Sequence, residues 1–198
     1  YEISTRDWSS DVCSSDLDKP TPPELAQAAQ ALGLAVARSA TFPSMARAPD
    51  DKGGASRLAS VKAVSSAYPL RGALQLRRTP EGAVESVAAA PEPGTAWVEA
   101  SLLDALQLQV GDALLLGDAT LKITRLIAIE PDRGAGFSAF APRVMLAEAD
   151  LAATGLIQPA SRVNYRLAVA SPANRDADVR SEEHTSELQS RVDISYAV

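Results

Sequence analysis

Residues 110–129, VGDALLLGDATLKITRLIAI, decide the fold class. Two apolar runs flank Gly117-Asp118, a dipeptide typical of a two-residue turn, so residues 113–116 and 119–129 are predicted to form a β-hairpin. Alternation along the return strand places four apolar residues on one face, namely Leu121, Ile123, Ile127 and Ile129. The centre of the chain is therefore expected to be an antiparallel sheet.

Working outward from this hairpin, breaker residues divide the rest of the chain into short segments. Residues 43–56 are rich in Pro, Gly and Asp and are predicted to form a mobile loop, and residues 79–94 a long connection. Helices are expected between Thr21 and Gly33, from Ser101 to Leu106 and over 148–153. Strands are predicted at 34–42, 58–64, 70–77, 96–99, 143–146 and 162–170. This order predicts an α+β domain with a mostly antiparallel sheet and a few short helices.

The two ends of the chain are related to each other through the genetic code. Residues 7–17, DWSSDVCSSDL, and residues 180–190, RSEEHTSELQS, can be encoded by the two strands of one DNA segment read in shifted frames. That DNA resembles a common short-read sequencing adapter. Residues 1–17 and 180–198 are therefore expected to be translated adapter sequence, with little regular structure and few buried contacts, and residues 18–179 to be the domain itself.

Excluding these ends changes the chemistry that the chain can perform. They hold eight of the 25 acidic and three of the 19 basic residues, so the net charge of −6 falls to −1 in the domain. That balance gives no indication of nucleic-acid binding. The ends also hold the only cysteine, Cys13, and the only histidine, His184. No cofactor and no metal site is expected, and Ser–His or Cys–His catalysis is excluded within residues 18–179.

Five charged residues are candidates for contact with a partner. Glu130, Asp132 and Arg133 lie in the polar segment EPDRG at 130–134, whose bland interpretation is a solvated turn with a local ion pair. Arg162 and Arg166 alternate with Asn164 on one face of a predicted strand. They suit an anionic partner, although a solvated sheet face gives the same pattern. No catalytic residue is predicted.

Several motifs of the chain resemble one family. They are VKAV (61–64), YPLRG (68–72), WV (97–98), LxLxVGDxLxLG (106–117), EPDRG (130–134) and DLxxTGLIQPxSRVxYRL (150–167). Together they resemble the extracytoplasmic domain of FtsX-like, MacB-type ABC transporter permeases, and the last motif is the most specific. The resemblance covers about residues 20–170 and implies a fragment of a larger bacterial protein.

The resemblance implies a location, partners and a mechanism. The parent protein would lie in the bacterial inner membrane, with this domain in the periplasm and a separate ABC ATPase as its partner. ATP hydrolysis would be coupled to substrate extrusion or to mechanical action on an envelope protein or lipid-linked substrate. The chain itself would not be an enzyme, and homodimerisation is left open.

Two other hypotheses remain open at this stage. The chain could be a stand-alone extracytoplasmic ligand- or peptide-binding domain. It could also be a hydrolase that uses Glu130 and Asp132, which would require both carboxylates in one pocket and a raised pKa on one of them.

Overall fold

The computed structural model describes residues 12–17, 19–133, 140–159 and 161–171. No helix among these residues is long and apolar enough to cross a membrane. The elements in chain order are β1 (Val12–Leu17), α1 (Pro23–Ala31), β2 (Ala35–Arg47), η1 (Asp50–Lys52), β3 (Ser56–Val64), β4 (Leu74–Arg77), β5 (Glu85–Val87), β6 (Thr95–Val98), α2 (Ala100–Leu106), β7 (Ala113–Leu116), β8 (Ala119–Ile129), β9 (Arg143–Ala147), α4 (Glu148–Leu151), η2 (Ala152–Thr154) and β10 (Asn164–Ala170).

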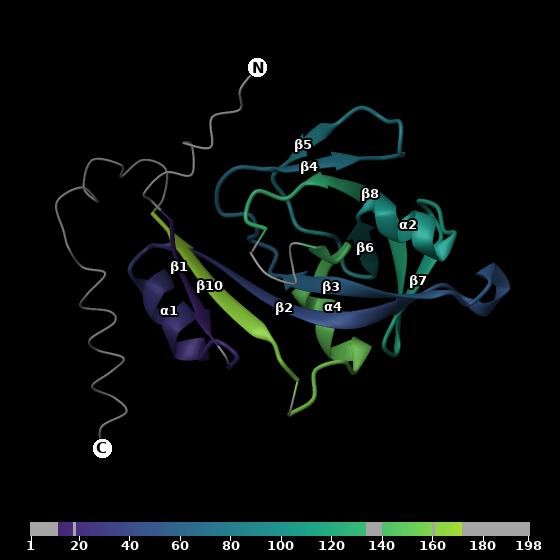
Figure 1. The fold of residues 1–198 in the computed structure, drawn as a ribbon. Coiled ribbons are helices and arrows are strands. Elements are labelled where there is room, and N and C mark those ends of the chain that lie inside the picture. Colours follow the sequence, from purple (N-terminus) through teal and green to yellow (C-terminus); the bar gives the residue numbers. More distant parts are fainter. Residues whose placement is uncertain (1–11, 18, 134–139, 160, 172–198) are drawn as a thin grey trace.

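The strands form a single sheet in the order β1-β10-β2-β3-β9-β6-β8-β4-β5, and β7 pairs with both β2 and β8. The long strand β2 crosses the molecule, from α1 at one end to the turn at η1 at the other (Figure 1). Of the pairs of neighbouring strands, β3 with β9 and β6 with β8 are parallel, and the others are antiparallel. The predicted α+β class with a mostly antiparallel sheet is confirmed.

The hairpin of β7 and β8 is found where the sequence places it, with Leu116 opposite Ala119 across the turn. The predicted face is wrong for its second half, because Ile127 packs in a different buried cluster from Leu121 and Ile123, and Ile129 is 53% exposed. The register of β8 shifts twice, once opposite Ala96/Trp97 and once opposite Gln75/Leu76. Each shift adds a residue to β8 and moves the later side chains to the other face.

The predicted loop at 43–56 is wrong in its first part, because β2 continues through Pro43 to Arg47. Pro43 lies opposite Ser60 of β3, between the residues of β2 that pair with β10 and those that pair with β7. Among the described residues no strand pairs with its other side there, and this is where a sheet tolerates proline best. The predicted connection at 79–94 also contains the short strand β5.

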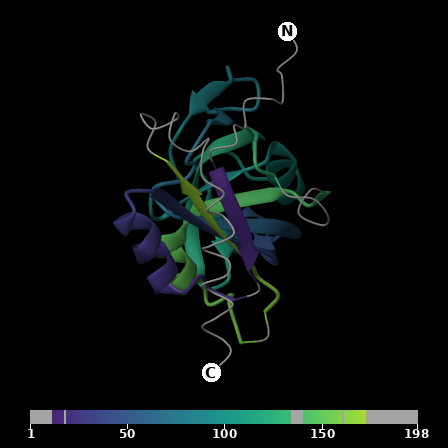
Figure 2. The same ribbon diagram turned by 90° about the vertical axis from the view of Figure 1, so that its left-hand side faces the viewer.

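The expectation that the first 17 residues lack regular structure is wrong for residues 12–17. These residues form β1, which pairs antiparallel with β10 along the edge of the sheet (Figure 2). A β-ladder is made by main-chain groups, so an exposed strand edge can recruit a segment whose side chains favour strands only weakly. Residues 1–11, including Trp8, and residues 180–198 lie outside the described part of the chain.

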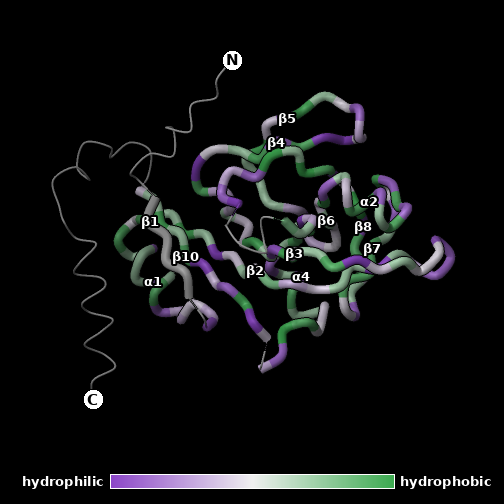
Figure 3. Tube along the Cα trace, in the orientation of Figure 1, coloured by the Kyte–Doolittle hydropathy of each residue, from purple (hydrophilic) through white to green (hydrophobic). Residues whose placement is uncertain are grey.

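Two clusters of buried apolar side chains hold the fold together. The larger lies under α2 and is contributed mainly by β2, β3, β6, β8 and β9. The smaller surrounds Trp97, Tyr68 and Met145. In Figure 3 hydrophobic stretches are seen at β6 and β8, whereas the turn at η1 is hydrophilic. The polar site described next lies beside the smaller cluster, since Tyr68 belongs to both.

Candidate functional site

A buried group of polar side chains lies beside the parallel pair β3·β9. We call it the Lys62 cluster, and it consists of Ser60, Lys62, Tyr68, Glu130, Asp132 and Arg143. Ser60 and Lys62 are on β3, Arg143 begins β9, and the two acids follow β8. Each of Lys62, Glu130 and Arg143 is less than 8% exposed. The cluster therefore joins β3 to the segment after β8 and to β9, and Lys62 and Glu130 are 68 residues apart in the sequence.

Lys62 is at the centre of the cluster and uses all three of its N–H groups. Its Nζ donates to Glu130 Oε1 at 2.8 Å, to Asp132 Oδ2 at 2.8 Å and to the Tyr68 hydroxyl at 3.1 Å. The ammonium also lies 4.5 Å from the centre of the Tyr68 ring. An ammonium group has three donors, so the hydrogen-bonding capacity of this buried cation is fully met.

Each oxygen of the two carboxylates also accepts a hydrogen bond from a neighbour. Arg143 Nε donates to Glu130 Oε2 at 2.7 Å, and the Tyr68 hydroxyl donates to Asp132 Oδ1 at 2.5 Å. Arg143 Nη1 donates in turn to the Ser60 hydroxyl at 2.5 Å. Two cations face two anions, so the cluster is neutral in total, which is the condition under which buried charges are tolerated.

Two pKa values show the effect of this environment. Burial by itself raises the pKa of Asp132, but the charge of Lys62, the hydrogen bonds from Lys62 and Tyr68 and the charge of Arg166 outweigh it. The pKa of Asp132 therefore lies below its ordinary value. Burial and the nearby Asp132 charge raise the pKa of Tyr68 far above its ordinary value. Asp132 is therefore ionised and Tyr68 protonated at neutral pH.

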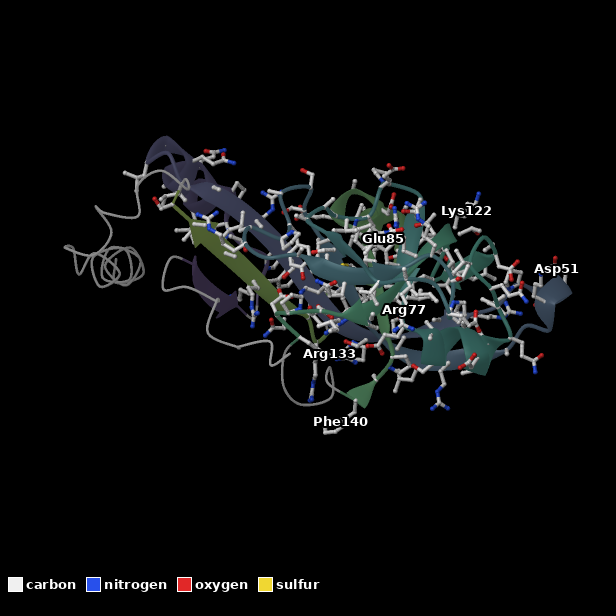
Figure 4. All side chains as sticks on the ribbon, turned by 90° about the horizontal axis from the view of Figure 1, so that it is seen from above. Asp51, Arg77, Glu85, Lys122, Arg133 and Phe140 are labelled. Atoms are coloured by element: carbon white, nitrogen blue, oxygen red, sulfur yellow. The ribbon has the colours of Figure 1, made fainter. Side chains whose placement is uncertain are left out.

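A second ion pair extends the cluster. The guanidinium of Arg133 pairs with Glu99 and donates to the carbonyl of Ala141 at 3.0 Å. Glu99 also accepts the main-chain N–H of Arg143 at 3.1 Å. Arg133 and Phe140 lie on the same side of the molecule, and Phe140 points outward from it (Figure 4). The start of the segment after β8 is thus held by ion pairs at its three charged residues, Glu130, Asp132 and Arg133.

The structure brings four of the five candidate residues close to one another. Glu130 and Asp132 are in the cluster, Arg133 adjoins it, and Arg166 of β10 lies with Asp132, Tyr68 and others around one small cavity of about 40 Å³. Arg162 is exposed and precedes β10, so it does not share a strand face with Arg166 as predicted. The interpretation of EPDRG as a solvated turn is wrong, because Glu130 is 7% exposed.

Sequence reasoning missed Lys62, Arg143 and Tyr68 as members of a site. One signal was available for Lys62, which lies in the run SVKAV between residues typical of a buried strand. A lysine in such a run requires a buried acid as its partner. Nothing in the sequence indicated which acid that would be, because Glu130 is 68 residues away.

The arrangement offers little to a hydrolytic mechanism. Every carboxylate oxygen of Glu130 and Asp132 already accepts a hydrogen bond from a cation or a hydroxyl. The pKa of Asp132 is lowered, whereas a general acid at neutral pH requires a raised pKa. No group of three or more metal-ligating side chains occurs among the described residues. The cluster acts as a clamp, in the sense that buried ion pairs tie the segment after β8 to β3 and β9.

A larger hollow lies on another part of the surface. It has a volume of about 470 Å³ and lies between α2, the residues that follow it, and residues 79–81 near the turn between β4 and β5. Leu103, Leu108 and Val110 supply its apolar lining, and Glu81 and Asp104 are acidic lining residues. Its volume is within the range of small-molecule sites.

Comparison with known proteins relates the chain to membrane transporters. No protein-family model matches it. Over 157 residues it is 36% identical to an uncharacterised ABC transporter permease, YbbP, of Escherichia coli K12. In structure it is similar to the periplasmic region of MacB from Actinobacillus actinomycetemcomitans, with a TM-score of 0.56 over 96% of this chain and 87% of that one, at 10% identity. This chain has the fold of that MacB periplasmic region, and we call it the MacB-like domain. The match to YbbP covers 79% of the chain and 18% of that protein.

A second solved structure has the same fold. A domain of a protein described as a putative permease, from Porphyromonas gingivalis, matches 91% of this chain and 82% of its own, with a TM-score of 0.51 at 13% identity. At such low identities the two structures establish the fold, while the relation to a permease rests on the sequence match. The resemblance inferred from the motifs is confirmed by both comparisons.

Proposed function

We propose that the MacB-like domain is the extracytoplasmic part of an ABC transporter permease in a bacterial inner membrane. The observation that carries this proposal is the 36% identity to an ABC transporter permease over 157 residues. In this proposal the domain lies in the periplasm, and a separate ABC ATPase binds the parent protein. ATP hydrolysis on that partner moves the domain, which extrudes a substrate or acts mechanically on an envelope protein or a lipid-linked molecule.

Two features of the structure support a mechanical role. The continuous sheet links α1 at one end with the turn at η1 at the other, so a displacement at one end is passed on rather than absorbed by a hinge (Figure 1). The Lys62 cluster locks the segment after β8 to β3 and β9 by buried ion pairs. Rigid packed elements are what transmit such movements between sites.

The contact residues divide into two groups in this proposal. Glu130 and Asp132 act as positioning residues, since they are enclosed and hold the segment that carries Arg133. Arg162 and Arg166 are the proposed contacts to an anionic partner. Apolar contacts are provided by Met45 and Leu58, which lie opposite each other on β2 and β3 and are 49% and 43% exposed.

A chimeric permease tests this proposal. In the E. coli permease, the segment that matches this chain is replaced by the corresponding residues of this chain. Alkaline phosphatase is inserted into the replaced segment after Asp51, at the turn of η1. This enzyme is active only in the periplasm. We expect phosphatase activity in cells and co-purification of an ATPase with the chimera. Phosphatase that is inactive although the chimera is full-length would place the domain in the cytoplasm and contradict the proposal.

A second candidate function is a stand-alone extracytoplasmic domain that binds a ligand or peptide. The hollow of about 470 Å³ beside α2 favours it, because its apolar lining and acidic residues suit a cationic ligand. Substituting Asp104 would then weaken ligand binding and leave folding unchanged.

A further inference from the structure

We propose that the outer edge of β10 is a docking edge for an extended peptide segment of a partner protein, which joins the sheet as an antiparallel strand. In this chain β1 occupies that edge. The proposal rests on the sheet itself and does not depend on the transporter assignment.

The pairing of β10 shows that its outer edge is regular enough to accept a strand. β1 pairs with six of its seven residues, from Val12 opposite Ala170 to Leu17 opposite Tyr165, without a shift of register. On the inner side all seven residues pair with β2, also without a shift. An added strand requires such a row of aligned main-chain donors and acceptors.

β10 lacks the features that normally protect an exposed edge. Its sequence, NYRLAVA, contains no proline and no lysine, and its single charged residue is Arg166. Edge strands that face solvent in monomeric proteins usually carry prolines, bulges or several charges, which prevent pairing with other chains. The edge of β10 is therefore suited to pairing with another strand.

β1 is a poor strand for this position, which makes it replaceable. Its sequence, VCSSDL, includes two serines and an aspartate, residues that favour strands weakly. Strand addition is driven by main-chain hydrogen bonds and tolerates many sequences. If residues 1–17 are translated adapter sequence, then a segment with no relation to the domain fills this edge, as such tolerance would permit.

The side chains of β10 indicate what the partner segment should contain. Leu167 is buried and Val169 is half-buried on one face, so apolar residues opposite them would extend the core. Arg166 belongs to the other face of β10. Opposite charges on directly opposite residues stabilise a pair of strands. The register puts Asp16 of β1 opposite Arg166. The expected partner is an extended segment with alternating apolar residues and an acid opposite Arg166.

Strand displacement from the full chain tests the proposal. A specific protease site is inserted between Lys19 and Pro20, a fluorophore is attached to Cys13, the only cysteine, and the folded protein is then cleaved. Unlabelled peptide of residues 10–19 is added, and fluorescence anisotropy reports release of the labelled strand. We expect release at excess peptide, while the far-UV circular dichroism of the domain stays unchanged.

Two variant peptides provide matched controls. A Ser15→Val peptide, which puts a branched apolar residue opposite Leu167, should act at a concentration roughly up to fivefold lower. A peptide with both Ser14→Pro and Ser15→Pro should not displace the strand. Consecutive main-chain N–H groups of a strand point to opposite sides, so one of these two faces β10, and proline has no N–H to donate.

Three results of the displacement assay would overturn the proposal. The labelled strand could remain bound at every peptide concentration, or the proline peptide could displace it as well as the others do. The domain could also unfold when the strand leaves, which would make β1 part of the fold rather than an occupant of a docking edge. As an independent measurement, hydrogen exchange of β10 in the uncleaved Ser14→Pro, Ser15→Pro chain should be fast, and an added peptide should slow it. Failure of the peptide to slow this exchange would also contradict the proposal.

Discussion

Replacing Lys62 by methionine should be among the most destabilising single changes in the domain. Methionine has a similar length and keeps the apolar packing, but it removes the three hydrogen bonds from Nζ. Two carboxylates then lose their shared cation in a place where the side chain of Glu130 is fully buried and that of Asp132 is 14% exposed. The change isolates the loss of one charge from the loss of volume.

The expected cost follows from the burial of the pair. Removing one partner of a buried ion pair costs about 3–5 kcal/mol. Glu130 keeps Arg143 and Asp132 keeps Tyr68, so a value within this range, and not above it, is expected. Domains are stable by about 5–15 kcal/mol, so the variant should fold but lose a large part of its stability.

Urea unfolding followed by far-UV circular dichroism measures this cost, and Lys52→Met is the matched control. Lys52 pairs with Asp112 at 3.1 Å, but its side chain is 48% exposed, so its replacement should cost about 0–1 kcal/mol. The double variant Lys62→Met, Asp132→Asn should lose less than the sum of the two single variants. If Lys62→Met costs no more than Lys52→Met, the cluster is not a clamp and the reasoning is refuted.

Three further predictions concern pH, backbone geometry and the ends of the chain. The pKa of Asp132 is lower in the folded state, so its contribution to stability is present above its unfolded pKa of about 4 and is lost as the pH falls through the folded pKa. The free energy of unfolding of Asp132→Asn, measured by urea titration, should therefore depend less on pH between pH 5 and 2 than that of the unchanged protein. Equal pH dependence of the two proteins would contradict the lowered pKa of Asp132. Gly117→Ala should lower the free energy of unfolding by about 1–3 kcal/mol more than Gly111→Ala does. Both glycines have positive φ, but of the two only Gly117 lies where an added Cβ would clash with a main-chain oxygen, that of Thr154. Thermal unfolding of the two variants checks this, and equal melting temperatures would show that the contact relaxes freely. Independent clones of the source DNA should be sequenced across the codons of residues 17/18 and 179/180. We expect both ends of the reading frame to differ from the present ones, and recovery of the same ends would refute their adapter origin.

The elements that depend on local patterns could be predicted from the sequence. Residues 113–116 and 119–129 form the predicted hairpin because two apolar runs and a Gly-Asp turn are all local signals. The strand near 162–170 was predicted from its alternation, although it begins at Asn164. Failures occurred where a partner strand decides the outcome. The bulges of β8 that expose Ile129 depend on its neighbours β4 and β6, and the extension of β2 through Pro43 depends on β3.

The candidate site divides in the same way. EPDRG was recognised as a cluster of charged residues because its members are adjacent in the sequence. That Glu130 is buried, and not solvated, follows from Lys62 and Arg143, which come from two other strands. The pairing energy of a buried ion pair depends on the distance between the two groups, and sequence separation does not predict that distance.

The sequence alone determined the α+β class, the central hairpin, the near-neutral charge of residues 18–179 and the kinship with permease domains, because each is carried by residue types and short-range spacing. Only the tertiary structure determined that Lys62 joins β3 to the segment after β8, that β3 and β9 run parallel, and that β1 occupies the edge of β10. These are long-range contacts. They form because a sheet aligns main-chain groups and buried charges must find partners, and both conditions are met only when distant segments come together.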